Sequence, residues 1–419
     1  MRFSFRSLAL TQPAPPLSLP TSPHATARAA TPIIADDAEP AAATQPVPST
    51  SASPARRTTP PRAAAKKPRK AAVQTVLGGG GGGGKGAGAI AAAAPAAAPK
   101  ATPGTPAPYP ALPAEAAHPY AHPPPRPPGH YCPLAQRLSP LPPGAYVALS
   151  WNVAGLAALL RKDPVALARL VATERADCLC LQEHKLQING TGGLDLGLPP
   201  GWHVSWAASV AKKGYSGVAI ATRHAPLSVR EGVGLGEADA EGRALAVELD
   251  GFWVATVYSP NAGEGLRRLG FRVEGGGWDE ALAAWVGDLS ASRGGKPVIL
   301  CGDLNVARDP VDIYAPDKKH EKAAGFTPEE RASFAARLLG GAGLVDCLRA
   351  RLPADQPAYT YWSYRAGNRP KNRGWRLDYF LAPAAFDASH ILDAFQLPHV
   401  PGSDHCPVGV VVRGGAEAE

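Results

Sequence analysis

The chain has 419 residues, of which 45% are hydrophobic and 19% charged, and its formal net charge is +8 at pH 7. No apolar run approaches the ~20 residues that cross a bilayer, which excludes a membrane-spanning protein and predicts a soluble one. The excess positive charge lies at one end, because residues 1–140 hold 14 Lys and Arg against 4 Asp and Glu, whereas residues 141–419 hold 29 against 31.

Residues 1–140 form a low-complexity segment dominated by Ala, Pro, Gly, Ser and Thr. The segment contains a run of seven glycines at 78–84 and a proline cluster at 123–128. Such a composition cannot bury enough apolar surface to offset the loss of chain entropy, so we predict a disordered tail. Residues 141–419 are then left to form one large domain.

The first 30 residues have the composition of an organellar transit segment. They include Arg2, Arg6 and Arg28 and several Ser and Thr, and no acidic residue precedes Asp36. This favours a chloroplast or a mitochondrion as the location, and the nucleus is the alternative, through the basic cluster at 66–70. The cysteines agree with a reducing compartment, and their spacing does not suggest a zinc site.

The basic residues of the tail have two further interpretations. Arg56, Arg57, Arg62 and the cluster at 66–70 could bind DNA phosphates without sequence preference, or they could be solvating charges in a linker. The tail is also where repair-protein partners could bind.

In the domain, short apolar segments typical of strands alternate with a few helical segments. Strands are predicted at 145–151, 177–182, 203–207, 216–222, 243–249, 252–258, 297–302, 375–381 and 407–413, and helices at 165–175, 278–292 and 328–339. The last helix follows Thr327, with Pro328 at its first position and Glu330 completing a capping box. This order favours an α/β fold with two sheets packed face to face and helices outside.

Polar side chains stand at the ends of several predicted strands. In chain order they are Glu183, Asp303, Asn305, Asp378, Asp404 and His405. One carboxylate at a strand end is common in any fold, but four carboxylates with one imidazole are difficult to explain by packing. They match metal-assisted hydrolysis of a phosphodiester, which needs a base for water, a metal ligand and a donor to the phosphate.

Eight short motifs carry a specific resemblance to a known family. They are SWNVAGL at 150–156, LCLQE at 179–183, GYSGV at 214–218, YSPNAG at 258–263, GDLNVA at 302–307, AGFTP at 324–328, GWRLDY at 374–379 and GSDHCP at 402–407. In order and spacing they resemble the exonuclease III family of apurinic/apyrimidinic (AP) endonucleases, within the endonuclease/exonuclease/phosphatase superfamily. The resemblance covers residues 145–413 and leaves the tail outside.

The resemblance implies a four-layered α/β sandwich, in which two mixed sheets pack face to face and helices flank them. It implies an enzyme of base-excision repair that hydrolyses the phosphodiester 5′ to an abasic site in double-stranded DNA, with 3′-phosphodiesterase or 3′ to 5′ exonuclease side activity. It also implies Mg²⁺ as the cofactor, with Mn²⁺ as a substitute, and we expect the enzyme to act as a monomer.

The family's functional residues can be placed on this chain. Glu183 would be the principal Mg²⁺ ligand, and Asp404 the other acidic contributor to metal binding. Asp303 would orient or deprotonate the attacking water, Asn305 would fix it, and Asn152 would hold Asp303. Depending on the number of ions bound, further residues lie in reach of the metal: Asn152, Asp303, Asn305 and His405.

The remaining implied roles concern the DNA. His405, kept charged by Asp378, would donate to the scissile phosphate, and Tyr258 and Asn261 would donate to its oxygens. Members of the family have a small apolar pocket that accepts a flipped abasic sugar and excludes an intact nucleotide. The positions of this chain that match the pocket are Tyr361, Trp375 and Leu377. Without the family match these three would be interpreted as ordinary core residues.

Three positions depart from the family. Ala154 stands where relatives have an acidic or amide side chain, so we expect weaker metal affinity. Glu264 replaces an arginine that enters the DNA groove in animal relatives. Arg365, followed by Arg369, Lys371 and Arg373, lies in a second loop, which in those relatives inserts apolar residues on the opposite side. We therefore expect this second loop to contribute more of the DNA grip. The alternative function is a catalytically weakened DNA-binding factor that uses the basic tail.

Overall fold

The computed structural model describes residues 138, 140–191, 194–292, 294–317 and 319–413. The predicted tail lies almost wholly outside these residues, and so do its targeting segment and basic cluster. In the described part of the chain, no helix is both long enough and apolar enough to cross a membrane.

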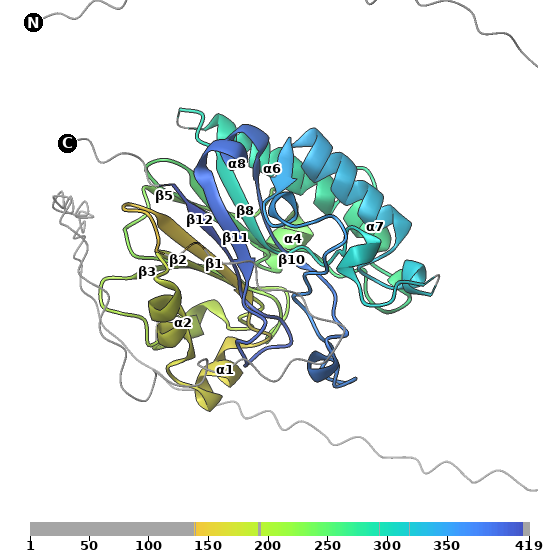
Figure 1. Ribbon diagram of the computed structural model, residues 1–419, viewed down its shortest axis with the longest axis horizontal. Coiled ribbons are helices and arrows are strands. Elements are labelled where there is room, and N and C mark those ends of the chain that lie inside the picture. Colours follow the sequence, from red (N-terminus) through yellow and green to blue (C-terminus); the bar gives the residue numbers. More distant parts are fainter. Residues whose placement is uncertain (1–137, 139, 192–193, 293, 318, 414–419) are drawn as a thin grey trace, which may run out of the picture. The chain divides into compact units, whose positions relative to one another are not determined.

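Two mixed sheets of six strands each form the domain (Figure 1). The first sheet has the order β11-β12-β1-β2-β4-β3, with β11 Ile391–Gln396, β12 Val408–Val412, β1 Tyr146–Asn152, β2 Cys178–Gln182, β4 Val218–Thr222 and β3 His203–Ala207. The second has the order β5-β6-β7-β8-β10-β9, with β5 Ser228–Glu231, β6 Ala244–Glu248, β7 Trp253–Tyr258, β8 Val298–Asp303, β10 Asp378–Pro383 and β9 Leu344–Asp346. The pairs β1–β2 and β7–β8 are parallel, whereas the other pairs are antiparallel.

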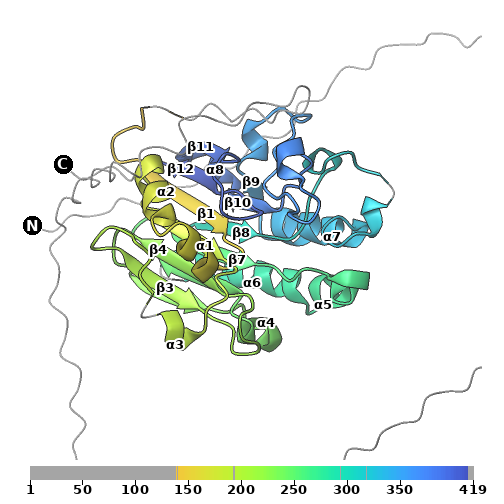
Figure 2. The same cartoon turned by 90° about the horizontal axis from the view of Figure 1, so that it is seen from below.

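The α-helices lie outside the sheets. Their bounds are α1 Leu156–Lys162, α2 Ala166–Glu174, α3 Ile188–Thr191, α4 Gly236–Ala240, α5 Leu269–Val273, α6 Trp278–Ala291, α7 Pro328–Ser333 and α8 Ala384–His390. Short 3-10 turns occupy Glu264–Leu266, Pro310–Asp312, His320–Lys322, Arg349–Arg351 and Arg369–Lys371. Figure 2 shows α1 and α2 on one side of the sheets and α5, α6 and α7 on the other.

The core is divided into layers. Between the sheets, Cys180 and Ile220 of the first pack with Ile299, Cys301 and Phe380 of the second. The outer face of the first sheet is covered by α2, and that of the second by α6 and the π-helical segment Phe334–Gly341. Because both faces of β2 and β8 are covered, these strands are buried at every position, and they are apolar up to the polar residues at their carboxyl ends instead of alternating. The predicted four-layered sandwich is confirmed.

The predicted strands and helices are all present, with shifts at their ends. The predicted helix 328–339 begins as α7, with Thr327 accepting from the backbone N–H of Glu330, and continues as the π-helical segment. The predicted strand 375–381 starts later, at Asp378, because Trp375 instead bridges to Tyr361 outside the sheet. The strands β5, β9 and β11 and the helices α1, α3, α4, α5 and α8 were not predicted.

Strand registers bring the polar strand ends together. In the first sheet Asn152 pairs with Gln182, which places Glu183 at the same edge. In the second sheet Asp303 pairs with Tyr258 on one side and with Asp378 on the other. The carboxyl ends of the parallel pairs therefore meet at one end of the sandwich, where the candidate site lies.

Candidate active site

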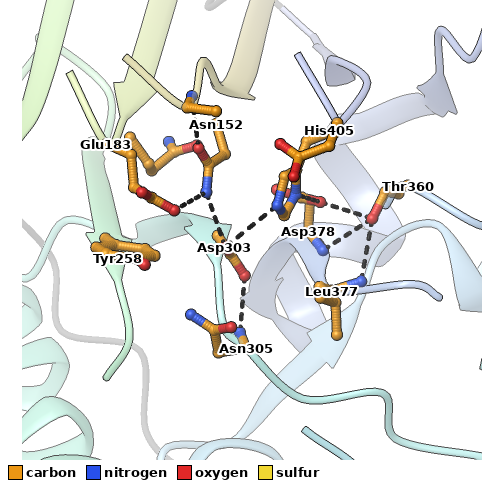
Figure 3. Close-up of polar contacts among 12 residues, drawn as sticks. Asn152, Glu183, Tyr258, Asp303, Asn305, Thr360, Leu377, Asp378 and His405 are labelled. Atoms are coloured by element: carbon orange, nitrogen blue, oxygen red, sulfur yellow. Dashed lines mark hydrogen bonds and ion pairs between the residues drawn. The ribbon is translucent and has the colours of Figure 1, made fainter. Parts of the chain in front are cut away.

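Asp303 lies at the centre of the polar cluster, 1% exposed. Its Oδ2 accepts a hydrogen bond from Asn152 Nδ2 at 2.9 Å, and its Oδ1 accepts one from the backbone N–H of Asn305 at 2.9 Å (Figure 3). The Nε2 atom of His405 lies 3.8 Å from Oδ2. Both carboxylate oxygens are thus held, while the imidazole stands beside one of them.

The chain is shaped so that Asp303 can take this place. Gly302 has φ +130°, and a Cβ there would lie 2.0 Å from the carbonyl oxygen of Val257 on the neighbouring strand, so only glycine fits. Asn305 has φ +49°, in the left-handed region that asparagine tolerates better than most residues. This turn lets the Asn305 backbone fold back onto the carboxylate.

His405 is oriented by a carboxylate and a hydroxyl. Its Nδ1 is 2.8 Å from Asp378 Oδ2, and Thr360 Oγ1 donates to the same oxygen at 2.6 Å. Thr360 also accepts from the backbone N–H groups of Leu377 and Asp378. All members of this chain of contacts are buried. Thr360 was not predicted, because its contact joins it to a strand that is distant in sequence.

The charges of the cluster shift two pKa values. Burial alone would lower the pKa of His405, but the neighbouring carboxylates of Asp378 and Asp303 and the hydrogen bond to Asp378 raise it to about 10. Burial raises the pKa of Asp303 to about 7, with Asp378 also raising it and charged His405 opposing the change. The site therefore combines a charged imidazole with a carboxyl group whose pKa lies near neutrality, which suits a general base.

Glu183 follows β2 at the edge of the cluster. Its Oε1 accepts from Asn152 Nδ2 at 3.0 Å, and its Oε2 is 2.9 Å from Lys185 Nζ. Burial would raise the pKa of Glu183, but Lys185 and the hydrogen bond from Asn152 lower it below its usual value. Glu183 is therefore ionised at neutral pH.

The donor set suits a hard cation. Ligand atoms of Asp303, Asp378 and His405 lie within 4.8 Å of one another. Charged His405 has no free lone pair for a metal, so the available ligands are the carboxylate oxygens, and Asn152 links those of Asp303 and Glu183. Carboxylate oxygens dominate this set, and Mg²⁺ and Mn²⁺ prefer such ligands. The carboxylate of Asp404 lies at the half-buried margin, where it contacts Ser403 Oγ at 3.5 Å.

Amide and hydroxyl donors line another side of the cluster. Asn261 Nδ2 donates to Asn305 Oδ1 at 2.8 Å, and Asn305 Nδ2 donates to the carbonyl of Ser259 at 2.9 Å. Burial, together with the charges of Glu183 and Asp303, raises the pKa of Tyr258 well above its usual value. The Tyr258 hydroxyl therefore keeps its proton and can donate.

Arg243 supports Tyr258 and was not predicted. Its guanidinium lies 4.7 Å from the centroid of the Tyr258 ring, and Nη1 donates to the Tyr258 carbonyl at 2.8 Å. Nη2 donates to Tyr215 Oη at 2.7 Å, and Nε donates to Glu241. These contacts depend on the β6–β7 pairing and on a distant loop, and thus gave no local signal in the sequence.

The three predicted pocket residues lie together beside His405. Tyr361 and Trp375 pack against an apolar cluster that includes Leu377 and Phe326. The Tyr361 and His405 ring centroids are 4.9 Å apart, and those of Trp375 and Phe326 are 6.3 Å apart. The arrangement places an apolar wall next to the imidazole, and Phe326 is its additional member.

In the basic loop after Tyr361, one arginine is exposed and another is bound to the protein. Arg365 is exposed, whereas Arg369 donates to the carbonyls of Ser403 and Val400 and lies 4.9 Å above the Trp362 ring. Arg369 therefore supports the segment that leads to His405. Glu264, at the start of a 3-10 turn, is exposed.

Comparisons with known proteins agree on one family. The Endonuclease/Exonuclease/phosphatase family matches residues 149–405. An exodeoxyribonuclease of Bacillus subtilis is 43% identical over 265 residues, covering 63% of this chain and 98% of that protein. A DNA-(apurinic or apyrimidinic site) endonuclease of Dictyostelium discoideum is 41% identical over 265 residues, covering 63% and 70%. The crystal structure of an AP endonuclease from Leishmania major has a TM-score of 0.58 at 33% identity, covering 65% of this chain and 88% of that one.

Proposed function

Because the chain belongs to the endonuclease/exonuclease/phosphatase family, and within it to the AP endonucleases of the exonuclease III type, we propose that it cleaves DNA 5′ to abasic sites. The chain is a hydrolytic nuclease of DNA repair. Cleavage at this position leaves a 3′-hydroxyl and a 5′-deoxyribose phosphate. The observation that carries the proposal is the buried Asp303, held through both oxygens and placed 3.8 Å from His405.

Nucleases of this family depend on a metal ion, and the residues present fit one. Mg²⁺ is the proposed ion, held by Glu183 with a contribution from Asp404, and Mn²⁺ is the expected substitute. The ion, when bound, supplies positive charge to the phosphate oxygens. The lowered pKa of Glu183, which keeps it ionised, supports this assignment.

Asp303 is the proposed general base. It takes a proton from the water that attacks phosphorus; the bond from phosphorus to the 3′ oxygen of the preceding nucleotide breaks, and this oxygen takes a proton from solvent to become the 3′-hydroxyl. Asn152 and Asn305 hold the two oxygens of Asp303 in place. His405, charged through Asp378, donates to a phosphate oxygen as negative charge develops there. Tyr258 and Asn261 supply further donors on the same side.

The apolar wall of Tyr361, Trp375 and Leu377 is proposed to select the substrate. A sugar without a base can approach His405 along this wall, whereas an intact nucleotide would bring a base into the same space. The proposed substrate is double-stranded DNA with an abasic site, and we propose that the enzyme acts as a monomer. The alternative function, a catalytically weakened DNA-binding factor, finds no support, since the residues required for hydrolysis lie together.

The test is magnesium-dependent nicking of a synthetic abasic duplex by the purified full chain. We expect one cut 5′ to the abasic site with Mg²⁺, no cut with EDTA, and no cut in the matched intact duplex. Duplexes with a blocked 3′ end and with an unpaired 3′ nucleotide, run in parallel, measure the phosphodiesterase and exonuclease side activities. Absence of nicking with Mg²⁺ and with Mn²⁺ would contradict the proposal.

A further inference from the structure

The ammonium group of Lys185 contacts the carboxylate of Glu183, the proposed metal ligand. Its Nζ lies 2.9 Å from Glu183 Oε2 and donates to the carbonyl oxygen of Ala154 at 3.2 Å. The Lys185 side chain is 35% exposed and that of Glu183 is 18% exposed, so water screens the pair only in part. A divalent ion at Glu183 would therefore share this oxygen with a fixed positive charge.

The backbone fixes Lys185 in this place. Glu183 and Lys185 have φ of +52° and +59°, and Ala154, across from them, has φ +51°. The N–H of Lys185 donates to the carbonyl of Ser216 at 2.9 Å, which anchors the turn. A Cβ on Gly155 would lie 3.7 Å from Lys185 Cδ, so the lysine stem passes beside this glycine toward Glu183.

Two neutral groups, Asn152 and the carbonyl of Ala154, also contact this pair. Asn152 donates to Glu183 and Asp303, and its own oxygen accepts from the N–H of Ala154 at 3.0 Å. Ala154 contributes a neutral carbonyl and has no polar side chain. Its carbonyl and the Glu183 carboxylate both contact the ammonium group, and the carboxylate supplies the opposite charge.

We propose that Lys185 competes with the divalent ion for the Glu183 carboxylate and thereby sets the metal affinity of the site. This inference rests on the proposed function, in which Glu183 binds the metal. The ammonium and the ion are like charges beside one acidic group, and their repulsion in a partly buried site opposes metal binding. Lys185 is a positioning residue in this account, since it acts on the metal ligand.

The test measures Mn²⁺ binding directly, by electron paramagnetic resonance and calorimetry on the full chain. Lys185→Met keeps the stem and removes the charge, and we expect it to bind Mn²⁺ about tenfold more tightly than the wild type, because the like charge beside the ion is lost. Lys185→Arg keeps the charge and should stay within about twofold of the wild type. The control Lys213→Met removes an exposed charge from the loop between β3 and β4 and should leave affinity unchanged.

The outcomes separate this inference from the proposed function. Equal or weaker binding by Lys185→Met would overturn the inference alone. Tighter binding by Lys185→Arg as well would also overturn it, because the charge would then not be the cause. If neither wild type nor variants bind Mn²⁺, the metal site itself is wrong. Lys185→Gln, a second neutral variant, repeats the measurement if Lys185→Met does not fold.

Discussion

The centre of the site is built from strand ends, whereas its rim is built from loops. Asn152, Asp303 and Asp378 belong to paired strands, and each is at most 2% exposed. Arg365 and Glu264, by contrast, are exposed side chains on connecting segments. The central residues are held by hydrogen bonds that cross between the two sheets, as Asn152 to Asp303 does.

Because of this difference, we expect the central residues to act in the chemical step and the rim residues to act in DNA binding. A buried group whose partners are fixed cannot move to compensate for a lost neighbour, so a change there alters the reacting geometry. An exposed side chain acts through screened charge and can be replaced at small cost. We therefore expect central substitutions to lower kcat by orders of magnitude, and rim substitutions to change DNA affinity with little effect on kcat.

The largest effect is expected for Asp303→Asn. The amide cannot accept the proton of water, so kcat for abasic incision should fall by about 10²–10⁴-fold, the usual contribution of a general base. Binding of abasic DNA should remain within a few fold of the wild type. Single-turnover nicking and gel-shift titration measure the two quantities separately.

The matched control is Asp250→Asn, an exposed carboxylate in the turn between β6 and β7. Normal turnover is expected for this variant, because the turn lies at the other end of these strands from the site. Retained turnover in Asp303→Asn would refute the role of Asp303 as the base.

A smaller but more diagnostic effect is expected for Asp378→Asn. The rate of the wild type should rise as pH passes about 7, where Asp303 loses its proton, and fall as pH passes about 10, where His405 loses its proton. Because Asp378 raises the pKa of His405, its removal should shift the alkaline fall to lower pH, by ~1–3 units. The kcat at pH 8 should drop by up to about tenfold, because a shift of ~3 units would leave only about a tenth of His405 charged at that pH.

The pH dependence of kcat, measured from pH 5.5 to 10.5, checks this shift. Thr360→Val is the companion variant, because it removes the hydroxyl that donates to Asp378 and leaves the carboxylate in place. The pH at which the rate of Thr360→Val falls should stay above the pH at which the rate of Asp378→Asn falls. An alkaline fall at the same pH in Asp378→Asn and the wild type would contradict the assignment of His405.

The central residues were predictable from sequence and their supporting partners were not. Glu183, Asp303 and Asp378 stand in short motifs at strand ends, and strand pairing brings such ends together without further information. Thr360 and Arg243 act through contacts made by loops and by neighbouring strands, which depend on the finished fold. Lys185 could be recognised only once its ammonium group was placed on Glu183.

The same reason explains the differences in secondary structure. Strong apolar strands such as β2 and β8 are evident from composition, whereas the three-residue β9 and the exposed edge strand β5 have no comparable pattern. Trp375 was predicted within a strand, but its pairing with Tyr361 draws it into the wall beside His405.

Trp375→Ala tests the boundary between the centre and the rim. Removing the ring opens the apolar wall, so an intact nucleotide should be excluded less well, and the ratio of abasic to intact cleavage should fall about tenfold. The ratio of kcat/KM values on matched duplexes measures this. Trp375→Phe, which keeps an aromatic wall, should preserve most of the discrimination, and an unchanged ratio in Trp375→Ala would argue against the pocket.

The smallest effect is expected at the rim, for Arg365→Glu. Reversing this exposed charge should weaken abasic DNA binding several fold and lower the slope of log affinity against log salt by about 1, since one phosphate contact is lost. The kcat at saturating DNA should change little. Arg230→Glu, an equal reversal on the exposed edge strand β5, is the control and should bind normally.

Glu264→Arg should act in the opposite direction and tighten binding. If Arg365→Glu binds as the wild type does while Glu264→Arg binds more tightly, the DNA path lies over the Glu264 segment and the loop that carries Arg365 is not part of it.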